Sequence, residues 1–239
     1  MRALLAGGLA AAIAAAGWAG AAAPPPGAGK EKGMEATDQS RPLSGEERAT
    51  LLRIARDAVE CRVKNLKAPG IERYALTPAL REHRGAFVTL TNRAPSNPVH
   101  PEPLRGCIGN FVSEKPLAET VREMAEEACS RDPRFPPVSE RELRDIRIEI
   151  SALSPLFPVA DPLSIRKGVH GVYIRPKGGR GGGTYLPQVW AEHFPDKDAA
   201  YFWTHLCRFK AGLPDDAWRR PDRYEALVYT ADVFGEETR

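Results

Sequence analysis

The sequence Leu104-Arg105-Gly106-Cys107-Ile108-Gly109-Asn110-Phe111 places a thiol between two glycines, with an arginine two positions before the thiol. Apolar side chains alternate along it, which predicts a β-strand. Successive side chains of a strand point to opposite faces, so Arg105 and Cys107 are expected on one face and Ile108 on the other. Gly106 and Gly109 leave room beside the thiol for another backbone or for a ligand.

Two interpretations of this stretch stay open. A guanidinium near a thiol favours the thiolate, the form that attacks carbon or binds metal. Cys107 is then a nucleophile or redox thiol, and Arg105 stabilises an anion. In the structural interpretation Cys107 is a small buried hydrophobe and the glycines mark a bulge. The residues of the stretch alone favour the structural interpretation.

Two further strands are predicted around this stretch. Residues 86–91 are β-prone, and their side chains alternate between two faces, which predicts a strand. The proline-rich residues 92–103, which include His100, are expected to form a loop that returns the chain to residue 104. The strands on either side of this loop are expected to pair. At residues 146–151 three isoleucines alternate with Arg147, Glu149 and Ser151, which predicts a strand with one apolar and one polar face.

Helical periodicity appears in two segments of the first half. A capping box at Ser44 to Glu47 starts a helix whose expected buried stripe is Leu52, Ala55, Val59, Val63 and Leu66. A second helix follows Ser113 and Pro116, and its expected stripe is Leu117, Val121, Met124 and Ala128. Another capping box, at Ser139 to Glu142, predicts a short helix.

The second half of the chain mixes strands and helices. Residues 170–174 predict a short strand and residues 198–211 a helix, with its buried side at Ala199, Phe202, Leu206 and Phe209. Residues 224–234 predict one last strand. The order lacks a strict β-α-β alternation, so we expect an α+β fold with a mixed or antiparallel sheet flanked by helices.

Composition limits the function classes. The chain has 239 residues, 42% of them hydrophobic, which is enough for a sizeable core. Lys and Arg number 34 against 31 Asp and Glu, so no general attraction to nucleic acid is expected. The glycines of residues 178–183 lack the lysine and spacing of a phosphate-binding loop. None of the four cysteines forms a C-x-x-C pair, so free thiols and no metal site are expected.

The first 43 residues differ from the rest. Residues 1–23 combine Arg2, an apolar run rich in Ala and Gly, and a small-x-small site at residues 19–21, which is typical of a secretory signal peptide. Residues 24–43 are expected to be a flexible spacer, and residues 44–239 one domain. The mature chain would be periplasmic or secreted, without a membrane anchor. Alternatively Met34 is the true start and the protein is cytoplasmic.

Six ordered motifs resemble the AMMECR domain, in its bacterial form called AmmeMemoRadiSam system protein A. The resemblance covers roughly residues 44–236, and its motifs are Leu104 to Gly109, Asp132 to Pro137, Ile148 to Pro155, Gly168 to Val172, Gly183 to Trp190, and Lys210 to Pro214 with Trp218. It implies an α+β fold with a larger and a smaller subdomain, and Memo-like and radical SAM proteins as candidate partners. It implies neither a reaction nor a cofactor. Asn110 departs from the family, which often has Thr there, and the signal-like N-terminus departs too.

A nucleophilic Cys107 needs a base, and the candidates are Glu149, His170 and His205. His170 precedes a glycine at a strand start, a good place for a site. His205 lies beside the apolar stripe of its helix, where a partly buried structural histidine is the usual outcome. With Arg105 as the anion-stabilising group, the candidate catalytic residues are Cys107, Arg105, Glu149 and His170.

The candidate binding residues surround the same stretch. Asp132 and Arg134 either clamp each other and fix their loop, or Arg134 binds an anion through both its nitrogens. Glu149 and Ser151 share the polar face of their strand, where Glu149 is able to pair with Arg105. The favoured function is a binding module for a small anionic ligand or a partner protein, and the alternative is an enzyme or enzyme subunit that uses Cys107. The binding set comprises Gly106, Gly109, Asp132, Arg134, Ser151 and His205.

Overall fold

The computed structural model describes residues 42–92, 104–179 and 181–236. The predicted signal peptide, Met34, His100 and nearly all of the predicted spacer lie outside these ranges. Within them the chain forms two compact units. The first comprises Pro42–Leu153 with residues 232–236, and the second comprises Ser154–Ala231.

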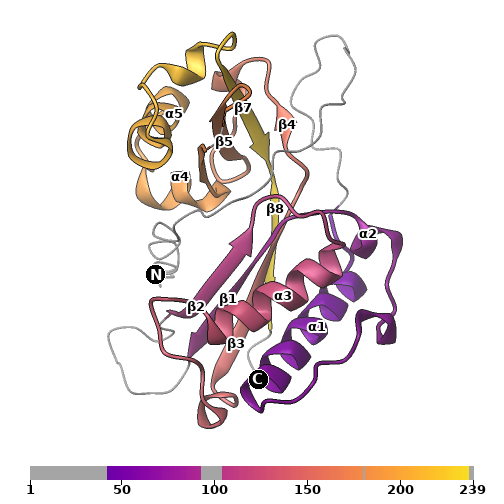
Figure 1. Ribbon diagram of the computed structural model, residues 1–239. Coiled ribbons are helices and arrows are strands. Elements are labelled where there is room, and N and C mark those ends of the chain that lie inside the picture. The colour runs from indigo at the N-terminus through magenta and orange to yellow at the C-terminus, as the bar shows by residue number, and fades with distance from the viewer. Residues whose placement is uncertain (1–41, 93–103, 180, 237–239) are drawn as a thin grey trace, which may run out of the picture. The chain divides into compact units, whose positions relative to one another are not determined.

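A four-stranded sheet with the order β2-β1-β3-β8 organises the first unit (Figure 1). Its strands are β1 (Ala86–Asn92), β2 (Leu104–Asn110), β3 (Ile146–Leu153) and β8 (Ala231–Gly235). β1 runs antiparallel to β2 and to β3, with Val88 opposite Ile108 on one side and Ile150 on the other. The pairing predicted for the two strands that flank the proline-rich loop is therefore confirmed.

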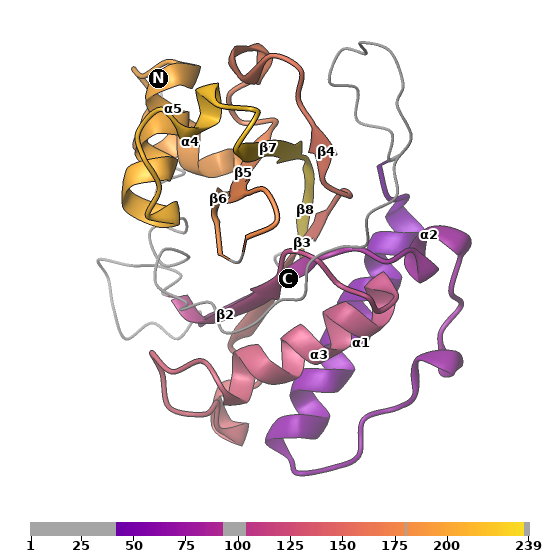
Figure 2. The same ribbon diagram turned by 45° about the horizontal axis from the view of Figure 1, so that its top comes forward.

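Two long helices cover one face of this sheet. α1 (Gly45–Val63) and α3 (Leu117–Ser130) lie side by side across it, as Figures 1 and 2 both show. The short elements of this unit are η2 (Ile71–Arg73), α2 (Pro78–Arg81) and η3 (Glu140–Glu142). The stripe predicted for α3 is buried as expected, and its residues form one core with the apolar face of the sheet.

The stripe predicted for α1 was only partly right. The helix buries Leu51, Ile54, Ala55, Ala58 and Val59. That set has the i, i+3, i+4, i+7, i+8 spacing but starts one residue before the predicted one. Leu66 lies beyond the helix end and is 63% exposed. The cap was predicted correctly, because Ser44 Oγ accepts from the N–H of Glu47, 3.2 Å away, and the Glu47 carboxylate accepts from the N–H of Ser44.

The boundary predicted for the spacer needs a correction. Leu43 is 3% exposed and belongs to the core of the first unit. Its N–H donates to Oδ2 of Asp232 at 3.0 Å. The ordered unit thus already includes Leu43, because burial of this apolar side chain extends the fold before the helix cap.

The second unit is built on a sheet with the order β4-β7-β5-β6. The strands are β4 (Phe157–Pro158), β5 (Gly171–Pro176), β6 (Gly183–Tyr185) and β7 (Tyr224–Tyr229), and neighbours pair antiparallel. The helical elements are η4 (Pro162–Ser164), α4 (Pro187–His193), α5 (Ala199–Leu206), the π-helical turn η5 (Cys207–Ala211) and η6 (Ala217–Arg219). Trp190, Phe202, Trp203 and Leu206 fill the core between helices and sheet.

Two predictions for the C-terminal part were wrong. Residues 224–234 form two strands of different sheets, β7 and β8, and not one strand. The break lies at Thr230, whose N–H donates to Oγ of Ser154 at 2.9 Å while its carbonyl accepts from the N–H of Ser154. Phe209, predicted to be buried, is 66% exposed. A π-helical turn rotates less per residue than an α-helix, so Phe209 falls off the line of Phe202 and Leu206.

The predicted α+β class is confirmed by the two sheets and their helices. All four cysteines are free thiols, as expected. No helix in the part of the chain that the structure describes has both the length and the hydropathy to cross a membrane.

Candidate functional site

Three polar side chains lie in register across the sheet of the first unit. Thr89 of β1 stands opposite Cys107 of β2 on one side and opposite Glu149 of β3 on the other. We call Cys107, Thr89 and Glu149 the polar row. Their chain neighbours pack in the core with the helices: Val88, Ile108, Ile148 and Ile150. Since side chains alternate along a strand, the polar row lies on the face opposite α1 and α3.

The Cys107 thiol is enclosed and held in its neutral form. Its residue is 5% exposed, and Thr89 Oγ1 donates to Sγ at 3.3 Å. Burial raises the pKa of Cys107 above its usual value. The Thr89 hydrogen bond and the Arg134 charge oppose this rise, while the carboxylates of Asp132 and Glu149 add to it. Cys107 is therefore a neutral thiol at neutral pH, as the structural interpretation expects.

Arg105 does not face the polar row, and its predicted pairing with Glu149 was wrong. Its Nε donates to Oε1 of Glu142 at 2.6 Å and its Nη2 to Oε2 at 3.2 Å. Nη1 and Nη2 also donate to the carbonyls of Pro136 and Pro137 at 2.9 and 3.2 Å. The register between β1 and β2 shifts between Leu90 and Thr91, so Arg105 leaves the simple alternation of its strand.

Glu142 was missed as a site residue by sequence reasoning. The hydrogen bond from Arg105 lowers the pKa of Glu142 to about 2, although burial acts in the other direction. The capping box was the only signal in the sequence, and it is confirmed, because the Glu142 carboxylate accepts from the N–H of Ser139 at 2.9 Å. One carboxylate thus caps η3 and holds Arg105.

Asp132 and Arg134 form a clamp on β2, the edge strand of the sheet. Arg134 donates to both carboxylate oxygens of Asp132, at 2.9 and 2.6 Å. Asp132 Oδ2 accepts the N–H of Cys107 at 2.8 Å, and Arg134 Nη2 donates to the Cys107 carbonyl at 3.1 Å. The two side chains thereby satisfy the N–H and the carbonyl of Cys107 that point away from the sheet. On an edge strand such groups are otherwise open to pairing with another chain.

The charge of Asp132 is stabilised in this clamp. Burial alone would raise the pKa of Asp132, but hydrogen bonds from Arg134 and from the N–H of Cys107 outweigh it and hold the pKa below the usual range. The clamp alternative is therefore the one that the geometry bears out. The Arg134 guanidinium donates to the Asp132 carboxylate and to the Cys107 carbonyl.

The two glycines beside Cys107 are required by close approaches within the unit. A Cβ at Gly106 would lie 2.2 Å from the carbonyl oxygen of Ala128 in α3. A Cβ at Gly109 would lie 2.2 Å from the Phe87 ring. These spaces are thus filled by the helix backbone and by an aromatic ring, which removes the need to invoke a ligand there.

The remaining candidates occupy separate surroundings. Ser151 is buried and lies opposite Phe87, two residues along its strand from Glu149 of the polar row. His170 belongs to the second unit, where it is buried and its Nδ1 accepts the N–H of Arg166 at 2.9 Å. His205 also belongs to the second unit, where its Nδ1 lies 2.9 Å from the hydroxyl of Tyr185. Of the three predicted bases, Glu149 is the one that shares a unit with Cys107.

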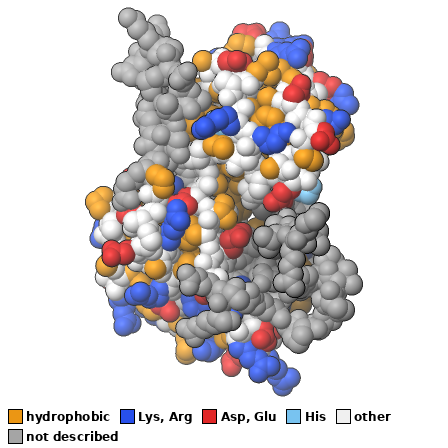
Figure 3. All heavy atoms as spheres, turned by 180° about the vertical axis from the view of Figure 1, so that it is seen from behind, with side chains coloured by type: hydrophobic (Ala, Val, Ile, Leu, Met, Phe, Trp, Pro, Cys, Tyr) orange, Lys and Arg blue, Asp and Glu red, His pale blue; other side chains and the backbone are white. Residues whose placement is uncertain are grey.

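The polar row itself combines the thiol of Cys107 and the hydroxyl of Thr89 with the carboxylate of Glu149. Across the described ranges, no three His, Cys, Asp or Glu side chains gather in a way that would hold a metal ion. On the face drawn in Figure 3, basic and acidic side chains are interspersed and form no field of one sign. Thr89 could not be found from sequence, because its place in the row depends on the register of three strands.

The comparisons with known proteins agree on one family. The AMMECR1 family model matches residues 52–234. A protein of Methanothermobacter thermautotrophicus is 39% identical over 204 residues, which cover 80% of this chain and 97% of that protein. A protein of Methanopyrus kandleri is 41% identical over 202 residues, covering 82% and 91%.

A solved structure shares the fold. The crystal structure of the uncharacterised protein PH0010 from Pyrococcus horikoshii superposes with a TM-score of 0.63 at 35% identity, covering 78% of this chain and 90% of that one. The names of these relatives state no activity, ligand or partner. On the match of the family model and the identity to these relatives, the chain belongs to the AMMECR1 family.

Proposed function

We propose that this AMMECR1-family domain is a binding module that recognises a partner protein at the polar row, without covalent chemistry. The observation that carries the proposal is the neutral, enclosed state of Cys107 beside the Glu149 carboxylate. A thiol in that state is a poor nucleophile, because the thiolate is the reactive form. It serves well as a small packing group.

The partner is expected to present hydrogen-bond donors. Glu142 pairs with Arg105 and Asp132 pairs with Arg134, so each guanidinium group already holds a carboxylate. Glu149, which is half-buried, supplies the carboxylate of the polar row. Backbone N–H groups and lysine or arginine side chains are the donors that a protein partner supplies to a carboxylate.

The finer family assignment supplies the first partners to test. We propose that the chain is the AmmeMemoRadiSam form of the family, on the six motifs of its sequence. Memo-like and radical SAM proteins are then the candidate partners. The relatives compared above are archaeal proteins, and their names do not bear on this assignment.

A binding titration of the full chain tests this proposal. A purified Memo-like protein and a purified radical SAM protein are titrated by calorimetry against the wild type, Glu149→Gln and Cys107→Ser. Glu149→Gln is expected to weaken binding about tenfold or more, since it removes one charge-assisted hydrogen bond. Cys107→Ser is expected to bind like the wild type. Glu127→Gln, on an exposed helix face, is the matched control for the loss of a carboxylate.

Two outcomes of the titration overturn the proposal. One is that neither protein binds the wild type. The other is that Glu149→Gln binds as tightly as the wild type while circular dichroism shows that it is folded.

The alternative function is an enzyme in which Glu149 is the base and Cys107 the nucleophile. Iodoacetamide labelling followed by mass spectrometry separates the two functions. A binding module predicts that Cys107 of the native protein stays unlabelled below about pH 8.5, the ordinary pKa of cysteine, while the more exposed Cys61 reports ordinary thiol access. Rapid labelling of Cys107 at pH 7 would establish the enzyme alternative instead.

A further inference from the structure

Three rings form a line on the second unit that is exposed at both ends. Tyr201, His205 and Phe209 follow one another at a spacing of four residues along α5 and the π-helical turn. We call them the aromatic stripe. Tyr201 is 40% and Phe209 66% exposed, and the ring centroids lie 5.8 Å (Tyr201 to His205) and 4.6 Å (His205 to Phe209) apart. Exposed rings that form a continuous group mark an interaction surface more often than scattered ones do.

The aromatic stripe is held rigidly by rings beneath it. Phe194 lies 4.5 Å from His205 and 5.6 Å from Tyr201, centroid to centroid, and it also contacts the fully buried Phe202. The hydrogen bond between Tyr185 and Nδ1 fixes the orientation of His205. Burial, and then the charge of Arg208, lower the pKa of His205, so the stripe is uncharged at neutral pH. Rings that are already ordered lose little entropy when a partner covers them.

Each end of the aromatic stripe carries charges of both signs. At the Tyr201 end, Lys197 Nζ lies 5.3 Å from the Tyr201 ring, and Asp198 caps α5 by accepting the N–H of Tyr201 at 2.8 Å. At the Phe209 end, Arg208 lies 5.7 Å from the Phe209 ring and pairs with Asp215. Each end therefore has one basic and one acidic side chain at its rim.

A two-fold axis would bring these ends together. In an antiparallel arrangement the Tyr201 end of one copy lies over the Phe209 end of the other. Lys197 and Asp198 of one copy then lie over Arg208 and Asp215 of the other, twice over by symmetry, which allows Lys197 to pair with Asp215 and Asp198 with Arg208. Self-complementarity of this kind is what an isologous contact requires.

We propose that the aromatic stripe is the surface through which two copies of this chain associate, antiparallel about a two-fold axis. The acidic side chains at both ends disfavour the anionic alternatives, a nucleic acid or an acidic membrane surface. A contact limited to three rings and their charged rims is small, so we expect the dimer to dissociate readily on dilution. The proposal is independent of partner binding at the polar row.

Sedimentation velocity on the full chain, over a micromolar to millimolar range, tests this proposal. The wild type is expected to shift from monomer to dimer as concentration rises. Phe209→Ser is expected to weaken the dimer about tenfold or more, because it removes the most exposed ring. Leu163→Ser is the matched control, since Leu163 is 51% exposed on the same unit but lies outside the stripe, and it should leave the dimer unchanged.

Charge exchange tests the antiparallel arrangement itself. Lys197→Asp and Asp215→Lys are each expected to weaken the dimer, and the double variant to restore it, with circular dichroism confirming that all three are folded. Glu149→Gln should leave the dimer intact. The proposal is overturned if the wild type stays monomeric throughout, if Phe209→Ser dimerises like the wild type, or if the double variant fails to recover association.

Discussion

Two regions of the molecule differ in whether their conspicuous side chains are paired or exposed: the edge of the first sheet at Cys107 and the aromatic stripe of the second unit. At Cys107, Asp132 pairs with Arg134 and both bind the backbone of the edge strand. In the second unit Phe209 and Tyr201 lie exposed. Internal contacts thus explain the charges of Asp132 and Arg134 beside the glycines. Phe209, by contrast, was predicted to lie in the core but faces solvent.

The difference follows from what each kind of group loses on burial. A buried charge must be paired, so a loop that approaches a sheet edge with Asp and Arg has to satisfy them internally. An exposed aromatic ring has no such requirement, and it remains available to a second molecule. The Asp132–Arg134 motif is therefore the weaker indication of function here. Phe209, which the sequence predicts to be buried and the structure shows exposed, is the stronger one.

The largest effect should come from opening the clamp. Asp132→Ala leaves Arg134 without its carboxylate and the N–H of Cys107 without its acceptor, so the free energy of unfolding should fall by about 3–5 kcal/mol. Urea denaturation measures it. The matched control is Asp216→Ala, which breaks an exposed aspartate–arginine pair with Arg220 and should cost less than about 1 kcal/mol. Similar losses in both variants would show that the clamp is no stronger than a surface pair.

The next effect tests whether the glycines serve packing. In Gly106→Ala the new methyl group meets the carbonyl oxygen of Ala128, so β2 and α3 must separate, at a cost of about 1–3 kcal/mol. A lower urea midpoint than that of the wild type is expected. Gly45→Ala is the control, because a Cβ there meets nothing within 4 Å. An unchanged urea midpoint for Gly106→Ala would show that Gly106 is not required for packing, and a ligand beside Cys107 would again be a reason for the glycine.

Acid should weaken the first unit through the pair that Arg105 forms with Glu142. The pKa of Glu142 is about 2 in the folded chain against its ordinary value of 4.5, so the contribution of this pair to stability is present above about pH 4.5 and is lost as the pH falls toward 2. We expect a loss of about 1–2 kcal/mol, reduced by solvent screening of this partly exposed pair. Asp132 titrates in the same direction, so the measurement is the difference between wild type and Glu142→Gln in urea denaturation at several pH values. The difference should shrink as the pH falls; a constant difference would contradict the pairing.

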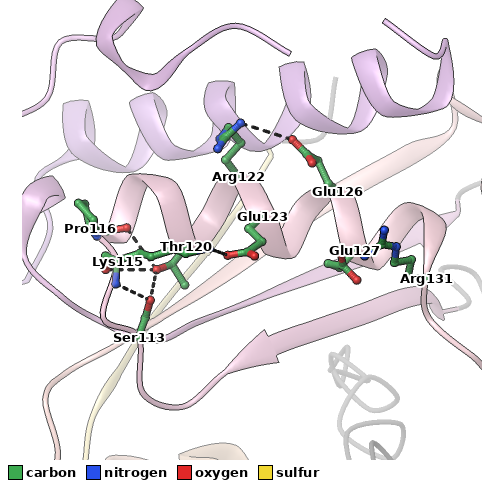
Figure 4. Close-up of polar contacts among 9 residues, drawn as sticks. All are labelled: Ser113, Lys115, Pro116, Thr120, Arg122, Glu123, Glu126, Glu127 and Arg131. Atoms are coloured by element: carbon green, nitrogen blue, oxygen red, sulfur yellow. Dashed lines mark hydrogen bonds and ion pairs between the residues drawn. The ribbon is translucent and has the colours of Figure 1, made fainter. Parts of the chain in front are cut away.

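The smallest effect is expected on the outer face of α3, which Figure 4 shows. Arg131 donates to Glu127 at 2.8 Å, in a solvent-exposed i, i+4 pair near the end of the helix. Glu127→Ala should change the free energy of unfolding by no more than about 0.5 kcal/mol. If Glu127→Ala lowered the free energy of unfolding as much as Asp132→Ala, solvent exposure would not predict how much an ion pair stabilises this unit.

Much of the fold was accessible from local pattern. The stripe of α3, the caps at Ser44 and Ser139 and the pairing of β1 with β2 were all predicted correctly. The errors arose where long-range contacts override local pattern. The hydrogen bonds between Thr230 and Ser154 break one predicted strand into two, and a π-helical turn turns Phe209 outward.

The sequence by itself determined the family, the fold class and the presence of Cys107 and Glu149 on strands, because periodicity and motif order are local properties of a chain. Only the tertiary structure decided the partners of the charged groups. Arg105 bonds to Glu142, 37 positions away, and Arg134 to the backbone of Cys107, 27 positions away. Such pairs depend on strand register and on the course of loops, and both are set by the packing of the whole unit.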